Sequence, residues 1–275
     1  MIKTIIRFLA RPFFLFLPLS LQRRIRSIFN RNFSQERKNK LLTKNLLQHA
    51  EAKVASGPFE GMNYVTQAAN SAFCPKILGT YEKELWPAIE EIVRGEYDQV
   101  IDIGAAEGYY AVGFALKIPN TRIIAFETDT HYHHLLRALA RLNAVEKSLE
   151  LRGHCFPNDL NHLLDEAKKT VVMCDIEGAE MELMDPDAVP ALRRCDLLIE
   201  THDFARPGVA DFLRRSFQNT HSITTIEGRN RAPADWPFAE EFPISSEMRA
   251  EMLDEQRNGV EQEWLWMKAN EKVSH

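Results

Sequence analysis

Strand-length apolar runs that alternate with helical patterns are the feature that most constrains the fold of this chain. Six runs rich in β-branched residues lie at Gln99–Ile103, Arg122–Phe126, Leu149–Leu151, Thr170–Cys174, Asp196–Ile199 and Ser222–Ile226. Helical patterns separate them at Tyr109–Lys117, Thr130–Leu142, Asp159–Lys168, Glu180–Leu192 (broken by Pro186 and Pro190) and Val209–Phe217. Because parallel strands need helical crossovers, this alternation predicts an α/β fold, a mostly parallel sheet with helices on both faces.

Two further segments complete the predicted fold. A helix near Ser246–Glu255 precedes a last strand within residues 261–269, which brings the count to seven and is a candidate for antiparallel pairing. Upstream, residues 34–95 predict a helical extension with helices over 34–56 and about 81–94, and with irregular or hairpin structure over 60–79. The sequence therefore divides into an arm (1–33), the helical extension (34–95) and a main domain (96–275).

The charge of the chain is unevenly distributed. Its net charge is −5, but residues 1–40 hold ten Lys or Arg and one acid, which gives +9 and leaves −14 for residues 41–275. An acidic body repels phosphate, so nucleic acid is not an expected partner. Four cysteines without a CxxC pair indicate neither zinc binding nor a disulfide framework, and they favour a reducing, cytoplasmic location.

The basic arm, residues 1–33, has two interpretations. Its longest charge-free apolar run, residues 12–22, is too short to span a bilayer, and no small-residue cleavage site follows it. Aromatic and leucine residues beside Arg23, Arg24 and Arg26 would suit peripheral contact with an anionic membrane surface. A helix that packs on the body or on another subunit fits equally well, and the oligomeric state stays open.

The loop after the first predicted strand excludes one common ligand. The stretch 99–129 has the outline of a dinucleotide-binding unit, in which G-x-G-x-x-G lets a pyrophosphate approach the backbone. Counted from Gly104, the second and third glycine positions hold Ala106 and Tyr109. A tyrosine at the third position obstructs helix packing, so this spacing argues against an NAD(P) dehydrogenase.

The remaining pattern suits a nucleoside without phosphates. It reads Asp102-x-Gly104-x-x-x-Gly108, and Glu127 closes the second strand. S-adenosyl-L-methionine (SAM) carries ribose hydroxyls and an ammonium group, which a strand-end carboxylate and an acidic loop can meet at the switch point of the sheet. The loop glycines would let the backbone lie against the nucleoside. The sequence therefore predicts a SAM site.

A second group of polar residues follows later strands. Asp175, Glu177 and Glu180 crowd the end of the fourth strand, and His202 follows the fifth. Crowded carboxylates repel one another unless a cation, a hydroxyl or a raised pKa relieves them, so they mark a candidate site. We expect Asp175 beside the sulfonium and His202 as a base that takes a proton from a hydroxyl. Oxygen ligands with His202 would also suit a divalent metal, but the spacing matches no metal motif and none is predicted.

The same segments resemble a known family. From about Lys76 onward the chain is similar to class I SAM-dependent methyltransferases, and "VVMCDIEGAEMELM" with "LLIETHD" looks like the FkbM-type group. The resemblance implies a Rossmann-like seven-stranded sheet of order 3-2-1-4-5-7-6 and methyl transfer to an oxygen of a sugar or other small molecule. It places SAM contacts on Asp102, Gly104, Ala105, Gly108, Glu127 and Thr128, with His154 and Cys155 near adenine. Two departures from that group are Ala106-Glu107 where its loop D-x-G-A-N-x-G has Asn and any residue, and Thr128-Asp129 in place of the usual proline.

Two functions of different class remain open. The first is a SAM-dependent O-methyltransferase that acts on a small polar acceptor such as a sugar or glycan hydroxyl. The second is a SAM-binding module without catalysis that serves regulation or assembly. Turnover of SAM with a candidate acceptor would distinguish them.

Overall fold

The computed structural model describes residues 46, 50–65, 73–164, 168–238, 244–255, 257 and 262–270. Residues 49–275 form one compact unit and residues 1–48 another. The predicted arm, residues 1–33, and most of the helix predicted over 34–56 lie outside the described residues. In the part of the chain that is described, no helix has the length and apolar character needed to cross a bilayer.

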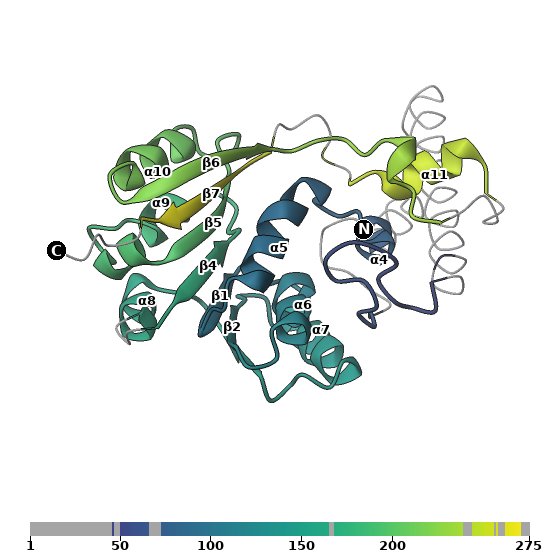
Figure 1. Cartoon of the computed structure of the whole chain (residues 1–275), viewed down its shortest axis with the longest axis horizontal. Coiled ribbons are helices and arrows are strands. Elements are labelled where there is room, and N and C mark those ends of the chain that lie inside the picture. Colours follow the sequence, from purple (N-terminus) through teal and green to yellow (C-terminus); the bar gives the residue numbers. More distant parts are fainter. Residues whose placement is uncertain are drawn as a thin grey trace, which may run out of the picture. The chain divides into compact units, whose positions relative to one another are not determined.

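The described strands form a seven-stranded sheet of order β3-β2-β1-β4-β5-β7-β6 (Figure 1). Neighbouring strands from β3 to β5 pair in parallel, whereas β7 runs antiparallel to both β5 and β6. This confirms the predicted α/β class, the strand order and the antiparallel last strand. The strands are β1 (Gln99–Ile103), β2 (Arg122–Phe126), β3 (Leu149–Arg152), β4 (Thr170–Cys174), β5 (Asp196–Thr201), β6 (His221–Glu227) and β7 (Glu263–Ala269).

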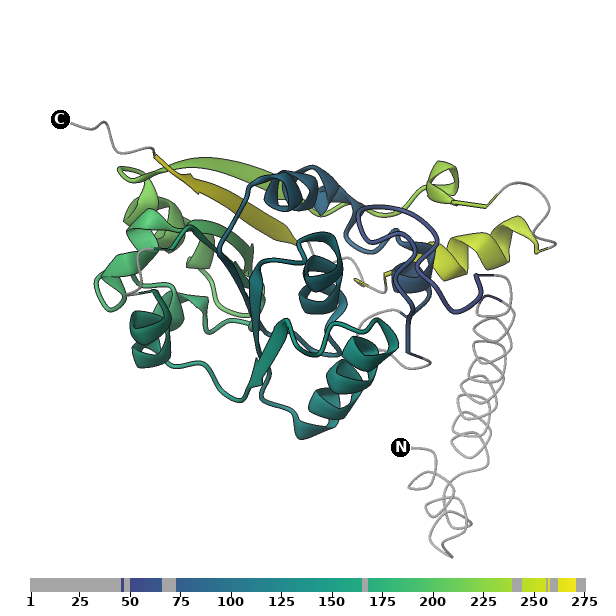
Figure 2. The ribbon, with the colours of Figure 1, turned by 60° about the horizontal axis from the view of Figure 1, so that its bottom comes forward.

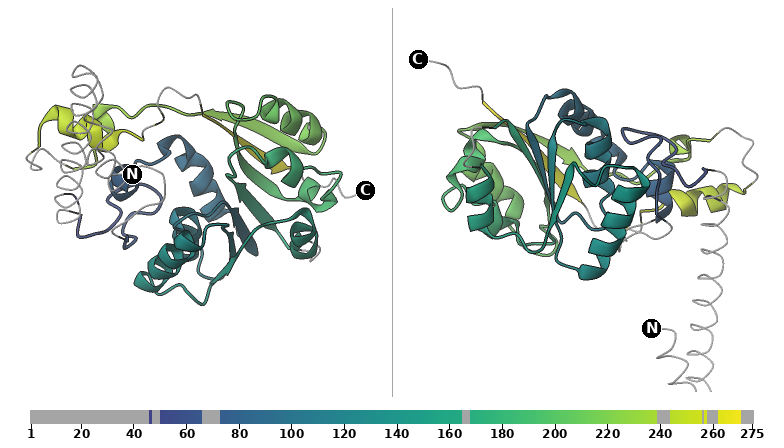
Figure 3. Two further views of the ribbon diagram at one scale, coloured as in Figure 1. Left: turned by 180° about the vertical axis from the view of Figure 1, so that it is seen from behind. Right: turned by 90° about the horizontal axis from the view of Figure 1, so that it is seen from below.

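Helices cover both faces of the sheet. On one face lie α5 (Trp86–Arg94), α6 (Tyr109–Lys117) and α7 (Thr130–Leu142), and on the other lie α8 (Pro157–Leu164), α9 (Glu180–Leu183) and α10 (Val209–Phe217) (Figures 1 and 3). Alternation along the strands supplies both faces: Ile101 and Ile103 of β1 join the core beneath α8 and α10, while the intervening Asp102 points to the opposite side.

The segment after the fourth strand is less helical than predicted. The helical pattern predicted over Glu180–Leu192, broken by Pro186 and Pro190, is reduced to α9, which ends at Leu183, and a 3-10 turn over Pro190–Arg194. Pro186 and Pro190 lack the amide hydrogen that a continuous helix requires, and each also disfavours helical geometry in the residue before it. The short α9 leaves room for the turn at residues 175–180, which carries several of the predicted site residues.

The extension before β1 also differs from the prediction. The predicted helix over 34–56 is wrong for residues 50–56, where a turn leads into an antiparallel bridge between Lys53 and Asn63. Helix α4 (Phe73–Leu78) occupies a region predicted to be irregular. Near the C-terminus, α11 (Ser246–Leu253) lies beside α4 (Figure 2). Two segments distant in sequence, α4 and α11, therefore meet.

Candidate functional site

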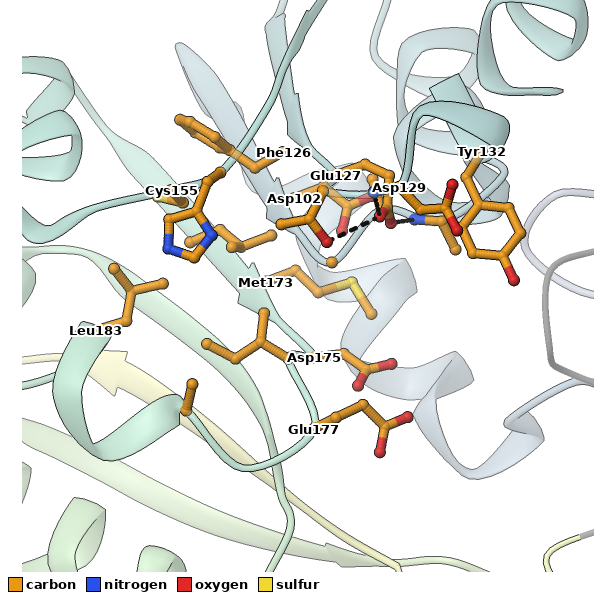
Figure 4. Close-up of a pocket in the computed structure, with 18 of the residues that line it drawn as sticks. Asp102, Phe126, Glu127, Asp129, Tyr132, Cys155, Met173, Asp175, Glu177 and Leu183 are labelled. Atoms are coloured by element: carbon orange, nitrogen blue, oxygen red, sulfur yellow. Dashed lines mark hydrogen bonds between the residues drawn. The ribbon is translucent and has the colours of Figure 1, made fainter. Parts of the chain in front are cut away.

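A cavity of about 720 Å³ opens where β1, β2 and β4 end (Figure 4). These are the carboxyl ends of neighbouring parallel strands, the edge at which open α/β sheets bind ligands. Most of the predicted site residues line this cavity: Asp102, Gly104, Ala105, Glu127, Thr128, His154, Cys155, Asp175 and Glu177. Gly108, Glu180 and His202 are not among its lining residues.

The glycine loop is fixed by a close approach between two strand ends. Gly104 has φ of 88°, and a Cβ atom there would lie 1.7 Å from the carbonyl oxygen of Asp175. The amides of Gly104 and Ala105 both donate to the carbonyl oxygen of Phe126 at 2.9 Å. Because any side chain at residue 104 would displace the loop from β4, glycine is required at this position. The loop thereby ties β1 to both of its neighbours.

Glu127 is held in a fixed orientation at the end of β2. Its Oε2 accepts a hydrogen bond from the amide of Ala106 at 2.8 Å, and its Oε1 accepts one from the amide of Asp129 at 2.7 Å. Ala106 adopts φ of 47°, a left-handed conformation that is uncommon for alanine and that occurs often at functional sites. Oε2 keeps a further lone pair for a ligand, whereas Oε1 also lies 3.5 Å from the hydroxyl of Thr128. A buried carboxylate anchored in this way can accept hydrogen bonds from a pair of hydroxyl groups.

Asp102 lines the cavity and has one oxygen without a hydrogen-bond partner in the described part of the chain. The side chain is buried, and its Oδ2 forms no hydrogen bond within the described residues. Burial and the nearby Asp175 raise the pKa of Asp102 to about 7. A buried acceptor without a donor is costly, so a ligand that brings an ammonium group would be stabilised here.

Glu107 is occupied by partners from the N-terminal extension. Its Oε1 accepts hydrogen bonds from Lys76 Nζ and from the hydroxyl of Tyr64, both at 2.6 Å. Burial alone would raise the pKa of Glu107, but the Lys76 ammonium holds it below its ordinary value. The Glu107 carboxylate therefore has a structural partner. Sequence reasoning missed Lys76 and Tyr64, although a buried acid in a loop is itself a signal that a cation must lie nearby.

Apolar and aromatic side chains surround the opposite end of the cavity. Phe126, Cys155 and Leu183 lie together there in Figure 4. The rings of His154 and Phe156 are 4.3 Å apart between centroids. Burial raises the pKa of the Cys155 thiol to about 12, so at neutral pH this side chain is an uncharged packing group. Flat apolar surroundings of this kind suit an aromatic base.

His202 is oriented by Glu180. Its Nδ1 lies 2.7 Å from Glu180 Oε1, which also accepts hydrogen bonds from the amides of Gly178 and Ile176. With Glu180 ionised, Nδ1 donates its hydrogen to Glu180, and Nε2 carries a hydrogen only when the ring is protonated. Burial alone would lower the pKa of His202, but the hydrogen bond with Glu180 and the charge of Asp175 raise it. Glu180 is thus a positioning residue and has no exposed surface.

Three carboxylates face the Nε2 of His202. Asp175 Oδ1 is 3.4 Å away, and Glu177 Oε2 and Glu200 Oε2 are each 3.6 Å away. Asp175 and Glu177 line the cavity, whereas Glu200 and His202 lie behind them. Burial raises the pKa of Asp175 to about 6, and burial with the charge of Asp175 raises the pKa of Glu200 well above its ordinary value. The predicted residues do come together, and Glu200 joins them.

Glu200 was missed by sequence reasoning. Residues two apart on a strand point to the same face, so His202 predicts that Glu200 of β5 shares its side of the sheet. That spacing was the available signal. Without the spacing to His202, nothing in the sequence distinguishes Glu200 from an ordinary residue near the end of a strand.

Comparisons with known proteins show only distant likenesses. No protein-family model matches the chain, and no curated protein matches it. Among solved structures, cofactor-bound Rv0187 from MTB has a TM-score of 0.43 and 15% identity, over 66% of this chain and 83% of that chain. A putative O-methyltransferase from Klebsiella pneumoniae has a TM-score of 0.40 and 10% identity, over 83% and 90%. The O-methyltransferase TomG from Streptomyces achromogenes, solved with SAM, has 0.40 and 14%, over 52% and 74%.

Proposed function

We propose that this chain is a SAM-dependent methyltransferase that acts on a hydroxyl oxygen of a small polar acceptor, such as a sugar or glycan. The charge of the cavity carries the proposal. Its lining holds six carboxylates and one Lys or Arg side chain: Asp102, Glu127, Asp129, Asp175, Glu177 and Glu182, with Lys76. Such a cavity favours a cationic ligand and repels a pyrophosphate.

The cavity has a suitable group for each part of SAM. Glu127, anchored by the Ala106 and Asp129 amides, accepts hydrogen bonds from the ribose hydroxyls. The unpartnered oxygen of Asp102 accepts a hydrogen bond from the ammonium. The adenine lies among the apolar groups around Phe126 and Cys155. When bound, SAM supplies a methyl group on a positively charged sulfur, which the surrounding carboxylates stabilise.

Methyl transfer takes place at the Asp175 and Glu177 end of the cavity. An acceptor hydroxyl held there would lie beside groups that can orient it and accept its proton. Within this proposal Asp175 contacts both cofactor and acceptor, and Glu177, which is exposed, connects the site with solvent. His202 with its Nε2 toward Asp175 is the base that the sequence predicts, and Glu180 holds it in place.

The proposal extends to location and partners. A cytoplasmic enzyme whose arm, residues 1–33, touches a membrane surface would meet lipid-linked as well as free sugars. Residues 1–33 lie outside the described residues, so this part rests on the sequence. Flotation of the full chain with vesicles that contain anionic lipid, compared with a chain lacking residues 1–33, tests it. Equal flotation of both chains would contradict membrane contact through the arm.

Turnover separates the enzyme from a SAM-binding module. The full chain is incubated with SAM and pools of hydroxylated acceptors, and formation of S-adenosylhomocysteine is measured. We expect acceptor-dependent formation, which Asp175→Asn abolishes while S-adenosylhomocysteine still binds. Binding without turnover across broad pools, sugars and glycans included, would favour the module.

A further inference from the structure

Three side chains from two strand ends converge on one point behind the acceptor end of the cavity. One ligand atom each from Asp175, Glu200 and His202 lies within 4.8 Å of the other two. Glu200 and His202 are almost entirely buried, and Asp175 reaches the cavity. An imidazole nitrogen and two carboxylate oxygens are three of the ligands that a cation needs, and further coordination positions would remain for water or substrate.

The orientation of the imidazole suits a metal ligand. Glu180 fixes Nδ1 through a 2.7 Å contact, so Nε2 faces Asp175 and Glu200. Histidine ligands commonly donate their other ring nitrogen to a carboxylate, which sets the tautomer and orients the ring. Glu180 itself is anchored by the amides of Gly178 and Ile176. His202 is therefore held by Glu180, and Glu180 is held in turn by two backbone amides.

The carboxylates around His202 lack a Lys or Arg partner among the described residues. In the described part of the chain, Asp175, Glu177 and Glu200 form no ion pair with Lys or Arg, and the cationic group within 4.0 Å of them is His202. Glu200 Oε1, buried with the rest of its side chain, has no hydrogen-bond partner there. Three carboxylates around one imidazole, with an orphaned buried oxygen, fit a site that takes up a cation.

We propose that Asp175, Glu200 and His202 bind a divalent cation of the Mn²⁺ or Mg²⁺ class. This inference rests on the proposed function, because the cation lies at the acceptor end, where it attracts the acceptor oxygen and favours loss of its proton. With the cation bound, His202 is a ligand instead of a base, and the proton passes to Glu177 at the mouth of the cavity. An imidazole beside two carboxylates suits Mn²⁺ better than Ca²⁺, which prefers oxygen ligands alone.

Mn²⁺ titration of the full chain tests the site without any activity. The electron paramagnetic resonance signal of free Mn²⁺ is followed as protein is added, in the absence of SAM and acceptor. We expect one saturable site per chain. Glu200→Gln and His202→Asn should each weaken Mn²⁺ binding roughly 10-fold or more. Glu182→Gln is the matched control, because it removes an equal charge from the cavity lining without touching the three ligands, and it should leave Mn²⁺ binding unchanged.

Asp175→Asn keeps the test decisive if the buried variants fail to fold. Asp175 retains a third of its side-chain exposure, so its amide variant should fold, and it should also lose Mn²⁺ affinity. Absence of saturable Mn²⁺ binding by the wild type, or wild-type affinity in Asp175→Asn, would overturn the inference. Binding of S-adenosylhomocysteine is measured in parallel: its presence without Mn²⁺ binding removes only the cation site, whereas Mn²⁺ binding without it supports the cation site and contradicts the proposed cofactor.

Discussion

The ammonium of Lys76 lies 2.6 Å from Glu107 Oε1, and both side chains are buried. This pair connects α4 with the loop after β1, the loop that carries Gly104 and Ala106. Tyr64 adds a second hydrogen bond to the same carboxylate oxygen. The N-terminal extension is thereby a structural part of the cofactor end of the cavity.

Removal of one member of this pair should destabilise the fold. Lys76→Met leaves the carboxylate of Glu107 buried without its cation, and the loss of one partner from a buried pair costs about 3–5 kcal/mol. Urea unfolding measures the change in free energy. The control is Lys268→Met, which breaks the half-exposed pair with Glu91 and should cost at most about 1 kcal/mol. Equal stability of the two variants would contradict a structural role for the Lys76–Glu107 pair.

Gly104→Ala should disturb both stability and cofactor binding. The new Cβ would meet the Asp175 carbonyl, and alanine at a positive φ adds strain of about 1–3 kcal/mol. Thermal unfolding should show a lower Tm, and calorimetry should show weaker binding of S-adenosylhomocysteine. Gly153→Ala is the matched control for stability, since its Cβ would meet nothing within 4 Å. A Gly104→Ala chain as stable as the Gly153→Ala chain would contradict the described loop geometry.

Glu127→Ala should weaken SAM binding with little effect on the sheet. Two charge-assisted hydrogen bonds from ribose, at about 1.5–3 kcal/mol each, correspond to a loss of at least roughly 100-fold in affinity. Isothermal calorimetry with S-adenosylhomocysteine measures it. Glu150→Gln, on the surface of β3, removes a carboxylate distant from the cavity and should bind as the wild type does. Unchanged affinity in Glu127→Ala would show that this carboxylate does not face the ligand.

SAM affinity should increase as the pH rises through about 7. The pKa of Asp102 is raised to about 7 by burial first and by Asp175 second, so its carboxylate gains charge across this range. The ammonium of the ligand, with an ordinary pKa of about 7.7–8.0, is still largely protonated there. Asp102→Asn should bind more weakly and with a flatter pH profile between about pH 6 and 7.5. A parallel profile in the variant would assign the dependence to another group.

The sequence was sufficient to predict the strands of the sheet and most of the polar residues that line the cavity. Hydrophobic periodicity located β1, β2 and β4, and position at their carboxyl ends was enough to bring Asp102, Glu127 and Asp175 together. The end of a strand can be located from the local sequence. Because the carboxyl ends of parallel strands lie at the same edge of the sheet, the residues that follow them come together in space. Residues predicted by that rule therefore needed no knowledge of side-chain packing.

Contacts between distant segments could not be derived in this way. Lys76 reaches Glu107 across 31 residues, and Glu180 reaches His202 across 22. Neither pairing follows from local periodicity, because each depends on how helices dock on the sheet. The helical pattern predicted after Glu180, already broken at Pro186 and Pro190, ends at Leu183, earlier than the first proline requires.

The most direct test of the central claim is calorimetric titration of the full chain with S-adenosylhomocysteine and, separately, with NAD. A cavity lined by carboxylates around Glu127 predicts saturable binding of S-adenosylhomocysteine that Glu127→Ala weakens, and no binding of NAD. Saturable binding of NAD without binding of S-adenosylhomocysteine would contradict the account.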